Sequence, residues 1–182
     1  MAKLDIIIGP MFAGKSSELL RRINLLKVLE KKYIVVKPEI DTRFSKNHIV
    51  SHNSIKEKCI TFTNLDDIIK YPLEEINTIF IDEAQFFTNL VQNVKTLLEQ
   101  YNINIVVSGL NGDSNRNKFG EILDLIPISN NIVKLNALCK ICMDGTFGIF
   151  THRLQDNNQQ VLIGAETEFI SVCRKHYLEL NK

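Results

Sequence analysis

Short apolar runs alternate with stretches of helical periodicity from the N-terminus to about residue 135. Each run is short and rich in β-branched or aromatic side chains, which is typical of strands buried inside a sheet. The runs occupy residues 4–8, 33–36, 78–81, 103–107 and 132–135. Apolar residues recur at helical spacing within 19–26, 90–98 and 122–126. Strands that alternate with helices in this way predict an α/β fold, in which helices flank a parallel sheet.

The pattern changes after residue 136. Cysteines, several glycines and a polar run at 155–160 replace the alternation of strands and helices. We therefore expect two domains, an α/β domain of residues 1–136 and a smaller domain of residues 137–182.

Composition is that of an ordinary globular protein, and it weighs against two classes of function. With 45% hydrophobic and 24% charged residues, a chain of 182 residues can bury a core. The formal net charge of +1 leaves no surplus of basic residues for a polyanion, so composition does not favour nucleic-acid binding. No apolar run approaches the roughly 20 residues that cross a bilayer, and residues 1–8 are too short for a signal peptide. We therefore expect a cytoplasmic protein with no membrane partner.

A phosphate-binding motif follows the first predicted strand. The pattern G-x-x-x-x-G-K-[ST] is matched, where a strand gives way to a helix, by Gly9, Pro10, Met11, Phe12, Ala13, Gly14, Lys15 and Ser16. Glycines let backbone N–H groups converge on phosphate oxygens, the lysine adds a positive charge, and the serine hydroxyl is a ligand for Mg²⁺. The alternative is a glycine turn that binds nothing, and the strand-to-helix context argues against it.

Two adjacent carboxylates, Asp82 and Glu83, end the third predicted strand. Ligands of α/β sheets lie at the carboxyl ends of the strands. Asp82 is therefore expected to hold Mg²⁺, directly or through water, and Glu83 to accept a proton from the attacking nucleophile. A solvated turn carrying two acids is the alternative. Phe86 and Phe87 follow, and on residue type alone we expect them to enter the core.

Three of the four cysteines cluster after residue 138, which in a reducing compartment suggests metal binding before disulfides. The pairs Cys139-x-x-Cys142 and Cys173-x-x-His176 supply four ligands that suit tetrahedral Zn²⁺. Four protein ligands leave no open position, so we expect a structural zinc rather than a catalytic one. Scattered thiols without a metal are the alternative.

Taken together, these motifs resemble the type II thymidine kinases. The resemblance covers nearly the whole chain and keeps the order and spacing of its motifs. It is carried by the phosphate loop and residues 18–22, by Asp41-Thr42-Arg43, by residues 82–87, by residues 118–120 and 133–135, by the cysteine pairs, and by residues 150–153 and 164–173.

The resemblance implies a P-loop NTPase (RecA-like) ATP-binding domain and a small zinc-binding domain whose lasso-like loop closes over the nucleoside. It implies a thymidine kinase that transfers the γ-phosphoryl group of ATP to the 5′-hydroxyl of deoxythymidine, giving dTMP. Glu83 then corresponds to the catalytic base. The expected ATP and phosphate ligands are the loop Gly9 to Ser16 with Ser17 and Arg43, and the expected Mg²⁺ ligands are Ser16 and Asp82.

The same resemblance implies a nucleoside pocket. Its expected walls are Met11, Phe86, Leu110 and Phe119, and its expected lasso side is Thr151, Leu162, Gly164 and Phe169. Family members commonly carry a tyrosine where this chain has Phe169, so we expect a packing role there. Without the resemblance, Asp41, Thr42 and Arg43 would be taken for exposed loop residues.

The resemblance also implies a homotetramer and feedback inhibition by dTTP. Two other classes of function stay open. The phosphate loop and acidic strand end would equally serve an ATPase with water as the nucleophile. A zinc element can also belong to a nucleic-acid-binding module, although no basic and aromatic stripe accompanies it here.

Overall fold

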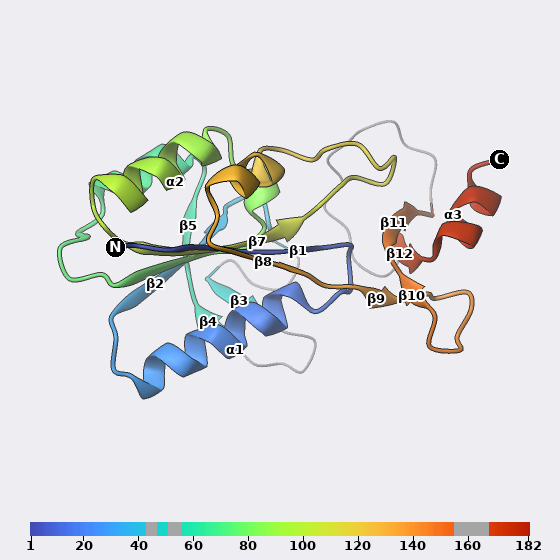
Figure 1. Ribbon diagram of the computed structural model, residues 1–182, viewed down its shortest axis with the longest axis horizontal. Coiled ribbons are helices and arrows are strands. Elements are labelled where there is room, and N and C mark those ends of the chain that lie inside the picture. Colours follow the sequence, from blue (N-terminus) through green and yellow to red (C-terminus); the bar gives the residue numbers. More distant parts are fainter. Residues whose placement is uncertain (43–46, 51–55, 155–167) are drawn as a thin grey trace.

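The computed structural model describes residues 1–42, 47–50, 56–154 and 168–182. Its centre is a parallel six-stranded sheet in the order β5-β2-β6-β7-β1-β8 (Figure 1). The strands of this sheet are β1 (Leu4–Gly9), β2 (Tyr33–Pro38), β5 (Ile60–Phe62), β6 (Thr78–Ile81), β7 (Asn104–Leu110) and β8 (Asn131–Lys134).

Helices cover both faces of the sheet, which explains why its central strands are almost wholly apolar. Helix α1 (Lys15–Val28) lies on one face, and α2 (Leu90–Glu99) lies on the other (Figure 1). The face of α2 also carries the 3₁₀ helices η1 (Leu65–Lys70) and η3 (Ile122–Ile128). Alternate residues of one strand enter different cores. On β6, Ile79 and Ile81 face α2, whereas Phe80 faces α1.

All five strands predicted from the apolar runs are present and parallel, and β6 has the predicted bounds. The sixth strand, β5, was not predicted. It is only three residues long, lies at the edge of the sheet, and is half-exposed along its length. Such a strand needs neither a long apolar run nor a clear alternation. The short antiparallel pair β3 (His48–Val50) and β4 (Lys56–Lys58) was also not predicted.

The helical periodicity at 122–126 predicted the element but not its type. The structure has a 3₁₀ helix, in which Ile122 and Leu125 are buried, Ile128 packs against the core at the same spacing of three, and Ile126 is exposed. Pro127 lies inside the element and has no N–H to donate. A 3₁₀ spacing therefore places residues 122, 125 and 128 on one side.

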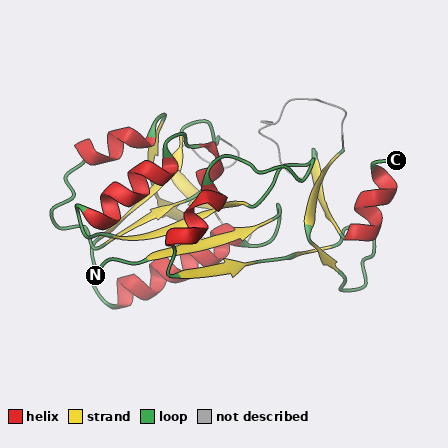
Figure 2. Ribbon diagram, turned by 45° about the horizontal axis from the view of Figure 1, so that its top comes forward, coloured by secondary structure: helices red, strands yellow, loops and turns green. Residues whose placement is uncertain are grey.

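The remaining elements lie beyond the end of the sheet at which the phosphate loop is found (Figures 1 and 2). Strand β9 (Ala137–Leu138) pairs with β10 (Phe147–Gly148), and β11 (Phe150–Arg153) pairs with β12 (Phe169–Val172), both antiparallel. Helix α3 (Arg174–Leu180) follows β12. Among the described residues, no helix is both long enough and apolar enough to cross a membrane.

Candidate active site

The phosphate loop joins β1 to α1. Gly14 precedes the helix with a φ of 80°, a left-handed conformation that costs glycine little and other residues more. The first turn of a helix leaves its N–H groups without partners inside the helix, and its dipole is positive there. The loop therefore opens onto a site that suits an anion.

Side chains of this loop reach the acidic end of β6. The Ser16 hydroxyl donates to Asp82 Oδ2 at 2.9 Å. Lys15 is buried, and its ammonium donates to the carbonyl oxygen of Pro10 at 2.7 Å. The two residues predicted as Mg²⁺ ligands are thus in direct contact, and the lysine bends back over the loop that precedes it.

Asp82 and Glu83 are both buried rather than solvated. Burial, and after it the neighbouring Glu83 charge, raises the pKa of the Asp82 carboxyl to about 6, against the hydrogen bond from Ser16 that lowers it. A carboxylate held in such a place gains from a cation that would share its charge. Glu83 has a φ of 50°, an uncommon conformation for a glutamate, of the kind that collects at functional sites.

A buried lysine stands beside this acidic pair, and the sequence patterns did not indicate it. Lys37 lies at the end of β2, and its side chain is 2% exposed. Its ammonium donates to the Asp41 carbonyl at 2.8 Å and approaches the Asp41 carboxylate at 3.4 Å. Asp41 is consequently buried, contrary to the expectation of an exposed loop residue. The only available signal was a lysine that directly follows a buried strand.

Four of the residues predicted for the nucleoside pocket form one buried apolar cluster, here called the Met11 cluster. It consists of Met11, Leu110, Phe119 and Phe169, with Phe12 and Phe86 packed against it at the edge. The rings of Phe86 and Phe119 meet edge to face, with 5.3 Å between their centroids. Phe87 instead enters the main core. Of the two adjacent phenylalanines that were expected in the core, Phe87 enters the main core and Phe86 packs against the Met11 cluster.

Two hydroxyl groups from the C-terminal part hold the backbone of Met11, and this arrangement is here called the hydroxyl clamp. The Met11 N–H donates to Thr151 Oγ1 at 3.0 Å, and Ser171 Oγ donates to the Met11 carbonyl at 2.5 Å. Thr151 and Ser171 are opposite each other on β11 and β12. The predicted pocket residue Thr151 thus contacts the phosphate loop. Arg43, Leu162 and Gly164, which were also predicted for the site, lie outside the described residues.

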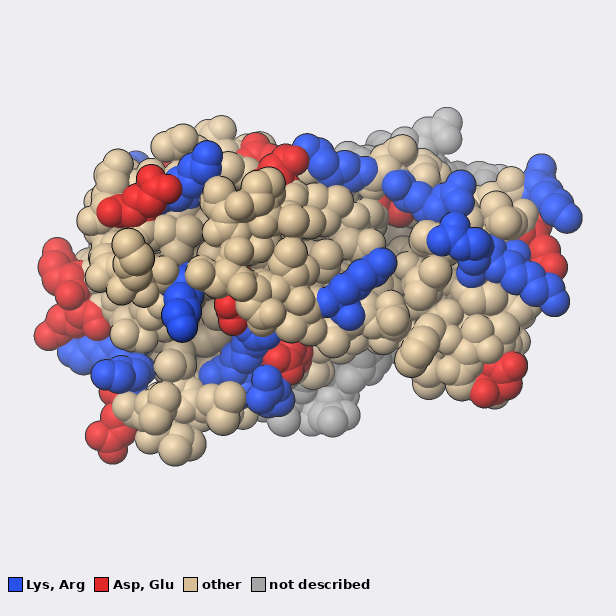
Figure 3. Space-filling model, viewed as in Figure 1, with Lys and Arg blue, Asp and Glu red and all other residues tan. Residues whose placement is uncertain are grey.

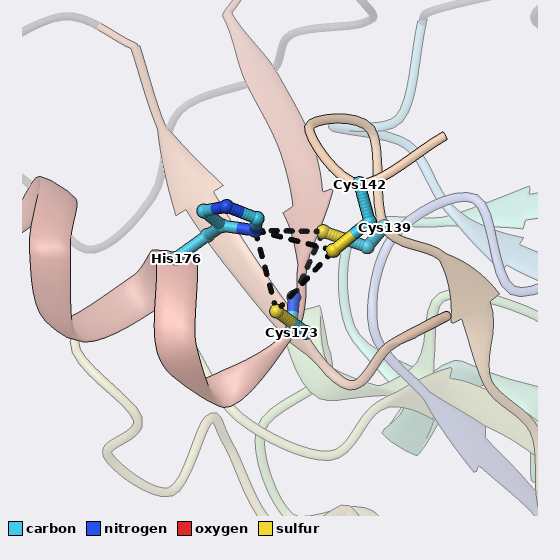
Figure 4. A group of neighbouring side chains, drawn as sticks. All are labelled: Cys139, Cys142, Cys173 and His176. Atoms are coloured by element: carbon cyan, nitrogen blue, oxygen red, sulfur yellow. Dashed lines mark hydrogen bonds between the residues drawn. The ribbon is translucent and has the colours of Figure 1, made fainter. Parts of the chain in front are cut away.

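The four predicted metal ligands come together (Figure 4). Cys142 Sγ and Cys173 Sγ are 3.8 Å apart, and His176 Nδ1 lies 3.4–3.5 Å from each of the three sulfurs. Around a tetrahedral zinc with Zn–S bonds of about 2.3 Å, sulfurs lie about 3.8 Å apart. Burial raises the pKa of the Cys139 thiol, but hydrogen bonds from backbone N–H groups outweigh it and lower that pKa to about 6. The donor set and its spacing fit a closed zinc site.

Helix α3 ties this cysteine group to the loop that follows β7. The Tyr177 hydroxyl donates to the Ser114 carbonyl at 2.7 Å, and the Arg116 guanidinium lies 4.5 Å from the centre of the Tyr177 ring. His176, the neighbour of Tyr177, is one of the four ligands. The ligand group and the loop that leads to Phe119 are therefore joined by one short helix.

Comparison with known proteins bears on the whole chain rather than on one motif. The thymidine kinase family model matches residues 2–177. A thymidine kinase of Mycoplasma mobile is 36% identical over 176 residues, which span 97% of this chain and 87% of that protein. Thymidine kinase a of Arabidopsis thaliana is 36% identical over 96% of this chain and 74% of its own length. A thymidine kinase of Bacteroides thetaiotaomicron is 36% identical over 97% of this chain and 87% of its own length. The resemblance noted from the motifs is confirmed, and the chain belongs to the thymidine kinase family.

Proposed function

We propose that this chain transfers the γ-phosphoryl group of ATP to the 5′-hydroxyl of deoxythymidine and releases dTMP. The observation that carries the proposal is the meeting of three parts at one end of the sheet. The Ser16 hydroxyl bonds Asp82, Glu83 follows directly, and Met11 belongs both to the phosphate loop and to the apolar cluster. A nucleoside base against that cluster would bring its sugar toward the acidic pair.

The phosphate loop would hold ATP. Backbone N–H groups of residues 12–17 would bind phosphate oxygens, and Lys15 would turn from the Pro10 carbonyl toward the β and γ phosphates. Ser16 and Asp82 would hold Mg²⁺, which when bound offsets the charge of the phosphates. Arg43 would add a further positive charge at the phosphates. Catalysis of this kind is mostly positioning and charge stabilisation.

Glu83 would accept the proton of the 5′-hydroxyl as that oxygen attacks the γ-phosphorus. The side chain is buried and stands one residue after Asp82, so a base and a proposed metal ligand share one strand end. Gln85 Nε2 donates to Glu83 Oε2 at 2.7 Å, which stabilises the ionised form that a base requires.

The Met11 cluster would hold the base of the nucleoside. Phe86, Phe119, Leu110 and Met11 offer an apolar wall, and Phe169 closes it from β12. Thr151 would act through Met11, to which it is bonded. From the resemblance, Leu162 and Gly164 complete the lasso side.

A zinc ion held by Cys139, Cys142, Cys173 and His176 would be structural, because all four tetrahedral positions come from the protein. It would join β9, β12 and α3 into a small domain of residues 137–182 beside the ATP-binding domain of residues 1–136. The resemblance further supports a homotetramer that dTTP inhibits, and the short apolar runs of the sequence support a cytoplasmic location. Sedimentation with and without dTTP, and turnover at rising dTTP, would test those two expectations.

Incubation of the zinc-loaded protein with ATP, Mg²⁺ and each deoxynucleoside in turn tests the central proposal, with chromatography to identify the monophosphate. We expect dTMP from deoxythymidine and little ADP without an acceptor. Glu83→Gln should reduce dTMP formation to a small residual rate and leave ATP affinity unchanged. Equal ADP formation with and without nucleosides, and no monophosphate, would instead favour an ATPase.

The nucleic-acid alternative has one feature in its favour. Lys and Arg side chains gather on the visible face over the end of the molecule that carries α3, where Arg174 and Lys175 are exposed (Figure 3). Retention of a labelled oligonucleotide that falls with rising salt would support that alternative. We expect no retention at physiological salt.

A further inference from the structure

We infer that Gln85 is a positioning residue that fixes the general base and the wall of the nucleoside pocket relative to each other. The inference rests on the proposed function and assigns a role to a side chain that itself need not touch the substrate. Gln85 lies in η2 (Ala84–Phe86) and is 3% exposed.

The two ends of the Gln85 amide contact the two parts of the site. Nε2 donates to Glu83 Oε2 at 2.7 Å, and Oε1 accepts from the Leu110 N–H at 3.0 Å. Leu110 belongs to the Met11 cluster. One planar group therefore joins the carboxylate that would take the proton to the backbone of a pocket residue.

The orientation of this amide is fixed by chemistry. A backbone N–H can only donate, so the atom that faces Leu110 must be the amide oxygen. The NH₂ group must then face Glu83, where it meets a carboxylate oxygen as acceptor. A flipped amide would place a donor against a donor at Leu110, so it would lose that hydrogen bond.

The backbone around Gln85 leaves the amide little freedom to move. A Cβ atom at Gly109 would lie 2.4 Å from Gln85 Oε1 and 2.8 Å from the Ile122 side chain. Any residue larger than glycine at position 109 would therefore displace the amide. Glycine at position 109 therefore permits the close approach of β7 to η2.

A displaced carboxylate is costly for proton transfer. A shift of about 1 Å in a reacting group can cost a factor of about 100 in rate. Loss of Gln85 would remove one of the hydrogen bonds that orient Glu83 Oε2 and the one that holds the Leu110 N–H, while the phosphate loop would keep its contacts. We therefore expect loss of turnover without loss of ATP affinity.

Gln85→Met removes both hydrogen bonds and keeps the length of the side chain. We expect kcat to fall about 10- to 100-fold, with the dissociation constant for ATP, measured by calorimetry, unchanged within a factor of about two. Gln92→Met, the same substitution at an exposed position of α2, is the matched control and should keep wild-type kinetics. A Gln85→Met protein with wild-type kcat, or one whose ATP affinity falls in step with kcat, would overturn the inference.

Two further variants separate positioning from a general effect on folding. Gly109→Ala keeps both polar groups of Gln85 but displaces the amide, so it should lower kcat in the same direction. In the Glu83→Gln background, Gln85→Met should cause no further loss of the residual rate, because the residue acts through Glu83. Losses that multiply in the double variant, or wild-type kcat in Gly109→Ala, would contradict the role. Absence of dTMP from the wild-type protein would instead overturn the proposed function itself.

Discussion

The hydroxyl clamp on Met11 offers the sharpest test of how the C-terminal part supports the phosphate loop. Ser171→Ala removes the donor to the Met11 carbonyl, and Thr151→Val removes the acceptor for the Met11 N–H. All three residues are at most 9% exposed, so water would not readily replace either partner.

The expected cost follows from the buried group that each change leaves behind. An unsatisfied buried backbone group costs about 1–3 kcal/mol. In a chain of this size each kcal/mol lowers the Tm by roughly 2–4 °C, so we expect each variant to melt about 2–12 °C lower. Both bonds hold the same residue, so the double variant should deviate from additivity by about 0.5–3 kcal/mol.

The assays are thermal unfolding with zinc present and steady-state kinetics with ATP as the varied substrate. On the proposed role of the loop, the KM for ATP should rise in both variants, because the N–H groups of the loop lose their fixed direction. Ser129→Ala removes a solvent-facing hydroxyl bonded to the Ile126 carbonyl at 2.8 Å and is the matched control. Wild-type Tm and KM in both clamp variants would refute the reasoning.

Three further predictions concern the metal, the acidic pair and the pocket. Chelation of zinc, or Cys173→Ser, should lower the Tm, because structural zinc ions supply folding free energy directly. Mass spectrometry should show the loss of about one zinc per chain. An unchanged Tm in the metal-free protein would contradict a structural zinc. The pKa of Asp82 without Mg²⁺ is raised above its unfolded value to about 6, so its contribution to stability in metal-free buffer should grow as the pH falls from about 7 to 5. Asp82→Asn should remove that pH dependence of the Tm, and an identical slope in the variant would exclude Asp82 as its source. Phe119→Ala should lower the free energy of unfolding by about 3–5 kcal/mol. It should also raise the KM for deoxythymidine more than the KM for ATP. Equal changes in both KM values would argue against a role of Phe119 in the pocket.

The central sheet could be predicted because its strands are covered on both faces, so that apolar runs mark them directly. The ligand set Cys139, Cys142, Cys173 and His176 was equally accessible, because two short spacings fix its pairs. Sequence patterns could not identify polar side chains whose importance comes from being buried in the folded protein. Lys37 and Gln85 are polar residues in unremarkable positions of the sequence, and only the packing of β2 and η2 shows that they are enclosed.

The failures have a common cause in tertiary context. Asp41 was expected in solvent, and it is buried because a lysine four positions earlier turns toward it. The period at 122–126 indicated an ordinary helix, whereas the element is a 3₁₀ helix that contains Pro127. The burial of Asp41 depends on a partner that no local hydrophobic pattern specifies.

The strand order has a consequence for the synthesis of the chain on the ribosome. Strand β1 leaves the ribosome before the other strands of the sheet, yet its two neighbours are β7 and β8, which begin about 100 and 127 residues later. Until then an apolar strand with two unpaired edges is exposed, and such edges are prone to aggregate. A nascent chain halted before β7 should therefore bind a general chaperone strongly, and release should follow only when the last strands of the sheet have emerged.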